Sequence, residues 1–204
     1  MIQAFLFDLD GVLTDTSEHH YQAWKRLAEE LGISFTREDN EALRGVSRRQ
    51  SLALLLKGRP VSEDEAEQLM QHKNSFYLDL VRHMQPGDLL PGAADLLREL
   101  RTANLRAAIV SSSKNAPLVI ERLGIGALVD WIVDGNAPAR SKPAPDLFLL
   151  AAEKLRLPPA ACIVVEDAAA GIEAAQAAGM RAIGLGPQER SEEHTSELQS
   201  PNTI

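Results

Sequence analysis

Hydrophobic and polar positions follow different patterns along the chain and divide it into three regions. Residues 4–9 form a short apolar run that ends in carboxylates and a glycine, which is typical of a buried parallel strand. Residues 17–84 place apolar side chains at helical spacing and show no strand pattern. From residue 91 onward, predicted strands at 106–111, 131–133, 161–165 and 181–185 alternate with predicted helices at 93–103, 115–123, 146–155 and 168–178.

The order of these elements predicts the fold class. Strands that alternate with helices of this length form βαβ units around a parallel sheet. We therefore expect an α/β protein with a Rossmann-like parallel core, interrupted after its first strand by an all-helical insertion. Within the insertion, Gly32 is expected to end the first helix. Ser47 and Ser62 are expected to cap later helices, with Glu65 in capping-box position after Ser62.

Residues 190–204, RSEEHTSELQSPNTI, depart from this pattern. They are polar, show no periodicity, and follow a predicted strand without completing the sheet. They resemble the in-frame translation of a widely used sequencing adapter. Our hypothesis is that the biological sequence stops near Glu189, and that a C-terminal edge strand and helix are missing. A natural disordered tail is the alternative, and the source DNA beyond the codon for Glu189 distinguishes the two.

Composition and charge narrow the classes of function. Of the 204 residues, 45% are hydrophobic, enough for one core with a modest additional domain. The formal net charge of -8 and the absence of a basic run argue against a nucleic-acid groove. No apolar run approaches the roughly 18 residues of a transmembrane helix, and the N-terminal run is too short for a signal peptide. Because Cys162 is the single cysteine, no internal disulfide can form, and we expect a cytoplasmic protein.

Two carboxylates, Asp8 and Asp10, stand two positions apart at the end of the first predicted strand. If the intervening Leu9 turns away, both can face one small volume, while Gly11 lets the backbone turn sharply. Two close carboxylates resist joint ionisation unless a cation or a shared proton intervenes. The pair therefore indicates a magnesium site or an acid/base pair, although an isolated Asp-x-Asp also occurs in solvated turns.

The longer string DLDGVLTDT, residues 8–16, resembles the first motif of the haloacid dehalogenase superfamily of phosphotransferases. This resemblance, which extends over residues 1–189, implies that Asp8 is a covalent nucleophile and that Asp10 is the general acid/base. It also implies that the helical insertion is a cap over the site. We thus expect a catalytic core of residues 1–14 and 87–189, a helical cap of residues 15–86, and a non-native tail of residues 190–204.

Three further motifs of that superfamily occur in order, each after a predicted strand. Ser111 would hold the transferring phosphoryl group, and Lys142 would neutralise charge on that group and on Asp8. The pair Glu166–Asp167 would complete a Mg²⁺ site with Asp8 and the Asp10 carbonyl. Taken singly, these residues also fit a helix cap, a surface lysine and a solvated acidic pair. The turn that would cradle the phosphoryl group contains Ser111, Ser112, Ser113, Lys114 and Asn115.

Strings in the insertion, such as LRGVSRRQSL and HKNSFY, resemble the β-phosphoglucomutase branch of the superfamily. By this resemblance His20 couples cap closure to Asp10, Arg48 grips the phosphate that is not transferred, and Lys73 reaches the sugar. Thr16 would lie at the hinge, and residues 45–51, from Gly45 to Ser51, would form the specificity loop. Ala168 and Arg140 depart from the pattern without removing a catalytic group. Each cap residue could also be an ordinary solvated side chain, and Trp24 is expected in the core.

The resemblance implies an Mg²⁺-dependent phosphomutase of carbohydrate metabolism. It would interconvert β-D-glucose 1-phosphate and glucose 6-phosphate, with β-glucose 1,6-bisphosphate as activator and intermediate. The expected partners are small-molecule sugar phosphates, with no nucleic acid and no membrane, and the expected state is a monomer. Two alternatives stay open: a sugar-phosphate phosphatase with the same motifs, and a non-catalytic binding protein on the same fold.

Overall fold

The computed structural model describes residues 1–186 and contains a parallel sheet in the order β3-β2-β1-β4-β5. All four strand pairs are parallel, with Leu6 of β1 aligned to Ala108 of β2 and Val164 of β4. This confirms the predicted fold class. The strands are β1 (Ala4–Phe7), β2 (Arg106–Val110), β3 (Trp131–Val133), β4 (Cys162–Glu166) and β5 (Arg181–Gly184).

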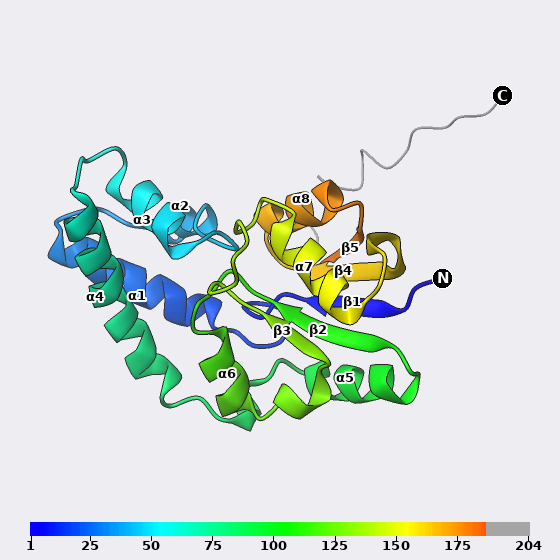
Figure 1. The fold of residues 1–204 in the computed structure, drawn as a ribbon. Coiled ribbons are helices and arrows are strands. Elements are labelled where there is room, and N and C mark those ends of the chain that lie inside the picture. The colour runs from blue at the N-terminus through cyan, green and yellow to red at the C-terminus, as the bar shows by residue number, and fades with distance from the viewer. Residues whose placement is uncertain (187–204) are drawn as a thin grey trace.

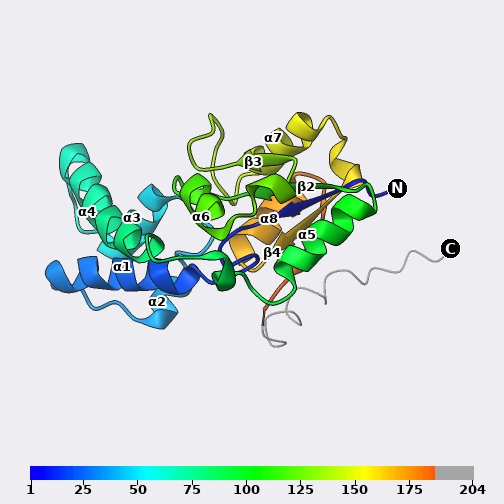
Figure 2. The ribbon, with the colours of Figure 1, turned by 90° about the horizontal axis from the view of Figure 1, so that it is seen from below.

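Helices cover both faces of this sheet, as Figures 1 and 2 show. α5 (Ala93–Thr102) and α6 (Ala116–Leu123) pack on the face that carries Phe7, Ile109 and Val165. α7 (Asp146–Leu155) and α8 (Ala169–Ala177) pack on the face that carries Leu6, Ala108 and Val164. Because side chains alternate along a strand, a strand between two helical layers needs apolar residues at successive positions, and this explains its continuous apolar run. Short 3-10 helices occupy Pro86–Asp88, Gly126–Leu128 and Pro159–Ala161.

The insertion after β1 is helical, as expected, and lies to one side of the core (Figure 1). Its helices have a hydrophobic cluster of their own, which includes Trp24, Leu27 and Leu55. Ser47 caps its helix with a complete capping box to Gln50. At Ser62 only half of the predicted box forms, because the hydroxyl accepts from the N–H of Glu65 without the reciprocal bond. The helices are α1 (Ser17–Glu30), α2 (Arg37–Glu41), α3 (Arg48–Leu56) and α4 (Glu63–Val81).

The chain passes twice between core and insertion, and hydrogen bonds tie the two crossings together. The hydroxyl of Thr14 donates to the carbonyl of Asp88 at 2.7 Å. The N–H of Leu90 donates to the carbonyl of Leu13 at 2.9 Å. The two connections therefore behave as one narrow joint beside the end of β1. The predicted domain boundaries stay predictions, and the hypothesis about residues 190–204 and the missing C-terminal elements lies outside the described residues.

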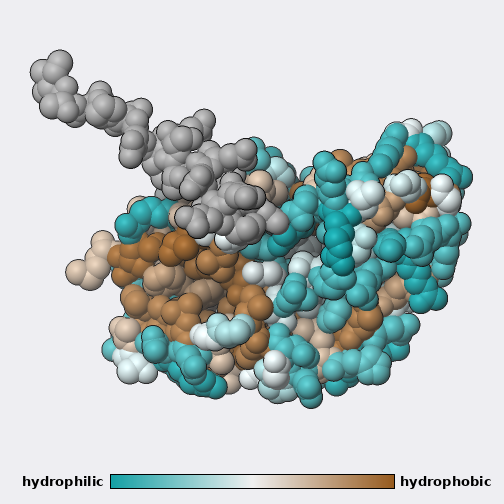
Figure 3. Space-filling model, turned by 180° about the vertical axis from the view of Figure 1, so that it is seen from behind, coloured by the Kyte–Doolittle hydropathy of each residue, from teal (hydrophilic) through white to brown (hydrophobic). Residues whose placement is uncertain are grey.

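Hydrophobic side chains gather on the back of the core, on the side away from the helical insertion (Figure 3). In the described part of the chain, Leu96, Ile183 and Leu185 are large hydrophobic residues that remain exposed, the last two in and after the edge strand β5. An apolar edge of this kind favours association between copies. Among residues 1–186, no helix is long and apolar enough to cross a membrane.

Candidate active site

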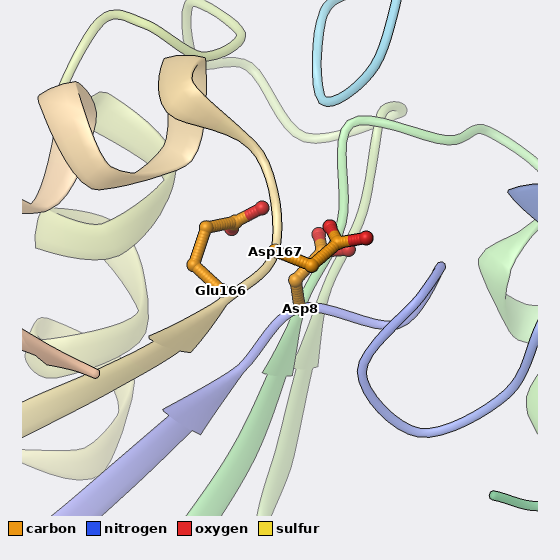
Figure 4. Close-up of side chains that lie close together, drawn as sticks. All are labelled: Asp8, Glu166 and Asp167. Carbon is orange, nitrogen blue, oxygen red and sulfur yellow. The ribbon is translucent and has the colours of Figure 1, made fainter. Parts of the chain in front are cut away.

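Three carboxylates meet at the carboxyl ends of neighbouring strands (Figure 4). Asp8 follows β1, Glu166 ends β4, and Asp167 comes directly after it. One oxygen from each residue lies within 4.8 Å of the others. Parallel strands bring residues distant in sequence to one edge of the sheet, and these three carboxylates lie at that edge. Oxygen ligands at this spacing suit a divalent cation, so the donor set fits the metal expected from the sequence.

Lys142 lies beneath this cluster and is fully buried. Its ammonium donates to Asp8 Oδ1 at 2.6 Å, to Glu166 Oε2 at 2.7 Å and to the carbonyl of Val110 at 3.0 Å. Burial alone would lower the pKa of Lys142, but attraction to Asp8 and Glu166 outweighs it and raises that pKa. Lys142 is therefore a fixed positive charge shared by two carboxylates.

Burial and the charge of Asp8 raise the pKa of Glu166 to about 8, although Lys142 opposes the shift. The same two causes raise the pKa of Asp167 to about 6, against the opposing charge of Arg44. Burial is the larger cause of both shifts, and repulsion from Asp8 adds to it. A further cation would relieve that repulsion.

Asp10 points away from the three-carboxylate cluster. Its carboxylate accepts a hydrogen bond from the hydroxyl of Thr16, and its backbone N–H donates to Asp8 Oδ2 at 3.0 Å. Burial, followed by repulsion from Asp8 and Asp167, raises the pKa of Asp10 to about 8. A carboxyl group that keeps its proton near neutral pH can both donate and accept one, which is the property required of a general acid/base.

Two glycines make room for these carboxylates. Gly11 has a φ of +88°, and a Cβ there would collide with Oδ2 of Asp167. A Cβ on Gly171, in α8, would collide with the carboxyl group of Glu166. Both positions therefore require glycine for close packing, and at Gly11 the positive φ adds a second reason.

The turn after β2 lines the same cavity as Asp8. Ser111 is buried, and its hydroxyl accepts from the N–H of Ser113 at 3.0 Å. The hydroxyl of Ser113 in turn accepts from the N–H of Asn115, the residue that precedes α6, at 3.2 Å. Lys114 is exposed and lines the same cavity as Asp8. The turn and the nucleophile predicted from the sequence therefore border one cavity.

His20 and Lys73 approach Asp10 from the cap side. Lys73 Nζ lies 2.9 Å from His20 Nδ1, and His20 Nε2 lies 3.9 Å from Asp10 Oδ1. Burial, together with the charges of Lys73 and Arg48, keeps the pKa of His20 well below its usual value. Lys73 is 1% exposed, and burial and the charge of Arg48 hold its pKa well below the usual value. A buried basic group of this kind suits an anionic or hydroxyl-bearing partner.

One cavity of about 310 Å³ connects these groups. This volume is at the lower end of the range for small-molecule sites. Cap residues form one wall and the core the other. Trp24 packs in the cap cluster, as predicted, and also borders the cavity. Thr16, Asn115, Lys142 and Glu166 support the site from outside this lining. The predicted residues that line it are Asp8, Asp10, His20, Gly45, Arg48, Ser51, Lys73, Ser111, Ser112, Ser113, Lys114 and Asp167.

Among the residues at the site that the sequence analysis did not name, three make specific contacts. Arg44 pairs with Asp167 across the cavity, Asn74 accepts from Asn115 Nδ2 at 2.7 Å, and Tyr77 stacks on His20 with ring centroids 4.1 Å apart. The hydroxyl of Tyr77 is buried, and burial raises the pKa of Tyr77 well above its usual value. All three lie inside LRGVSRRQSL and HKNSFY, the strings that carried the family resemblance. Their position in these strings was the sequence signal that could have identified them as site residues.

Comparison with known proteins places this site in context. Residues 2–179 match the family model of haloacid dehalogenase-like hydrolases. The chain is 45% identical over 189 residues to β-phosphoglucomutase of Bacillus subtilis, covering 91% of this chain and 84% of the relative. It is 27% identical over 187 residues to a phosphorylated carbohydrates phosphatase of Thermotoga maritima, covering 89% and 84%.

A crystal structure of β-phosphoglucomutase from Clostridium difficile superimposes with a TM-score of 0.90 at 40% identity, covering 95% of this chain and 88% of that one. The family match spans most of the chain, and the cluster of Asp8, Glu166 and Asp167 lies inside it. The superfamily resemblance noted in the sequence is thereby confirmed. The chain belongs to the haloacid dehalogenase-like hydrolase family.

Proposed function

We propose that this protein is a magnesium-dependent β-phosphoglucomutase, which interconverts β-D-glucose 1-phosphate and glucose 6-phosphate through β-glucose 1,6-bisphosphate. The observation that carries the proposal is a single cavity with Asp8 on its core side and the cations Arg48 and Lys73 on its cap side. A sugar bisphosphate needs positive charge at both ends, and Lys142 beside Asp8 supplies the other end. The similarity to two β-phosphoglucomutases supports the same function.

In the proposed reaction, an oxygen of Asp8 attacks phosphorus of the bisphosphate, and the bond from phosphorus to the sugar oxygen breaks. Asp10 donates its proton to that departing oxygen. The monophosphate then presents its other end, Asp10 removes a proton from the incoming hydroxyl, and this oxygen takes the phosphoryl group from Asp8. Asp8, Glu166 and Asp167, with the Asp10 carbonyl, would hold Mg²⁺, which supplies charge stabilisation to the phosphoryl oxygens.

Other residues bind and orient the substrate in this proposal. Ser111 and the N–H groups of the following turn hold the transferring phosphoryl group. Arg48 binds the phosphate at the far end, and Lys114 lies in the turn that cradles the transferring group. Thr16 and His20 position Asp10, and residues 45–51, with Gly45 and Ser51 at their ends, select the sugar. Ser112, Ser113 and Asn115 complete the turn.

The mutase proposal is tested by incubating purified protein with β-glucose 1-phosphate, Mg²⁺ and a trace of the bisphosphate. We expect glucose 6-phosphate to form with little free phosphate, activity to disappear when a chelator removes the metal, and activity to return when Mg²⁺ is added. A coupled assay for glucose 6-phosphate and a colorimetric assay for phosphate measure both products. Stoichiometric phosphate without glucose 6-phosphate would contradict the mutase proposal.

That second outcome would favour a sugar-phosphate phosphatase, in which water accepts the phosphoryl group from Asp8. The Thermotoga maritima relative, a phosphorylated carbohydrates phosphatase, is the observation that keeps this function as the second candidate. Both functions use the same nucleophile and acid/base, so the acceptor alone separates them.

Replacing Lys73 with methionine is expected to raise stability and weaken substrate binding. The Lys73 ammonium is buried over the rings of Trp24 and Tyr77, 4.9 Å from each centroid. Methionine fills the space without a buried charge, so the free energy of unfolding should rise by about 1 kcal/mol or more. We expect the KM for the sugar phosphate to rise at the same time. Urea titration and steady-state kinetics measure the two effects, with the exposed Lys25→Met as control. A destabilised variant with unchanged KM would contradict the proposed role.

A further inference from the structure

We infer that Arg44 competes with the divalent cation for Asp167, so that metal binding and this closed arrangement of the cap oppose each other. This inference rests on the proposed function, because it concerns the metal of that same site. It assigns to Arg44 a role in regulating metal occupancy rather than in binding substrate.

The first observation is an ion pair that crosses from cap to core. Arg44 lies between α2 and α3, and its Nη2 donates to Oδ2 of Asp167, 123 positions away in the sequence. The Arg44 side chain is 19% exposed and that of Asp167 is 8% exposed. In surroundings with so little water, the charge of Arg44 acts strongly on the carboxylate. One of the two carboxylate oxygens with which Asp167 could bind a metal is therefore already engaged by a cation of the cap.

The second observation concerns which positively charged side chain, Arg44 or Lys142, an entering metal ion could displace from the carboxylates. In the described chain, Asp8 and Glu166 share Lys142, which is fully buried and bonded also to the Val110 carbonyl. Arg44 instead borders the cavity and has a second carboxylate nearby, since its Nη1 lies 3.5 Å from Glu41 Oε2 in the cap. An entering cation can thus displace Arg44 toward Glu41, whereas displacing Lys142 would break three bonds.

The third observation is that other cap–core contacts use groups assigned to phosphate binding. Ser112 Oγ donates to the carbonyl of Gly45 at 2.8 Å, and Asn115 Nδ2 donates to Asn74 Oδ1 at 2.7 Å. In this arrangement, polar groups of the core therefore have hydrogen-bond partners in the cap itself. Because coupling between two equilibria is reciprocal, a contact that stabilises this arrangement must weaken metal binding, and metal binding must weaken the contact.

The test measures metal affinity without substrate, using Mn²⁺ as the probe and its electron paramagnetic resonance signal to count free ions. Mn²⁺ accepts the same carboxylate and water ligands as Mg²⁺. Arg44→Gln is expected to bind Mn²⁺ roughly tenfold more tightly than wild type, within the usual range of coupling between sites. Arg44→Lys, which keeps the charge but loses the planar fork, should lie between the two.

The matched control is Arg48→Gln, which removes an equal charge from the same cavity wall without touching Asp167. It should change Mn²⁺ affinity much less than Arg44→Gln, and thermal unfolding checks that each variant is folded. If Arg44→Gln itself does not fold, the Mn²⁺ affinity of Arg44→Lys is compared with that of wild type instead. Equal affinity in wild type and the Arg44 variants, or an equal gain in Arg48→Gln, would overturn the inference and leave the proposed function intact. No Mn²⁺ binding by any of these proteins would overturn the metal-dependent function, and the competition with it.

Discussion

Asp8→Asn is expected to lower phosphoryl transfer by at least about 10³-fold while the protein remains folded. The amide has the size of the carboxylate but is a very poor nucleophile toward phosphorus, so the covalent step is lost. Its oxygen can still accept from the N–H of Asp10, the bond that Asp8 Oδ2 now makes at 3.0 Å. Lys142 keeps its bond to Glu166. The geometry around the missing charge should therefore survive.

Transfer from radiolabelled bisphosphate to the protein measures this effect directly. Wild type should retain label on the protein after rapid acid quenching, and the variant should not. Asp15→Asn is the matched control, because Asp15 stands in the same motif but is exposed and bonds only to Ser17 Oγ, at 2.5 Å, among the interactions described. Unchanged turnover in Asp8→Asn would refute the nucleophile.

Lys142→Met is expected to lower both the activity and the stability of the protein. The ammonium is the shared partner of Asp8 and Glu166, and its removal leaves their buried charge uncompensated. Breaking a buried ion pair by removing one partner costs about 3–5 kcal/mol of unfolding free energy. Activity should fall by about 10² to 10³-fold, because the charge that stabilises the phosphoryl group beside Asp8 is gone.

Chemical denaturation and single-turnover kinetics separate these two losses. Lys154→Met, in α7 and exposed, should change stability by less than about 0.5 kcal/mol. A Lys142→Met protein with wild-type stability would show that the buried triad contributes nothing to folding. Wild-type activity would show that Lys142 is not needed for transfer.

Secondary structure in the core was well predicted because its causes are local. Strand 131–133 and helix 146–155 match the structure in their bounds, and the other core elements differ by one or two residues. Apolar runs between turn residues specify such elements wherever both faces of a strand are buried. The capping box was placed less well: it forms at Ser47 with Gln50 and only half forms at Ser62. In a capping box, the side chain at the third helical position accepts a hydrogen bond from the backbone N–H of the N-cap residue. Whether it does so depends on its rotamer, which the sequence pattern does not specify.

The convergence of the site was also predictable, in outline. Asp8, Ser111 and Asp167 each follow a strand, and the ends of parallel strands share one edge. The depth of Lys142 was not predictable from its place beside prolines, where a surface lysine is the common case. Only packing around its alkyl chain shows that it is fully buried.

The sequence by itself determined the parallel core, the helical insertion and the order of motifs, because periodicity and motif spacing are properties of short segments. Tertiary structure alone decided that Lys73 is buried beside His20 and that Arg44 reaches Asp167. These contacts join residues 53 and 123 positions apart, the first between two helices of the cap and the second between cap and core. They depend on how helices pack in the cap and on how the cap sits over the core, and no local pattern encodes either arrangement.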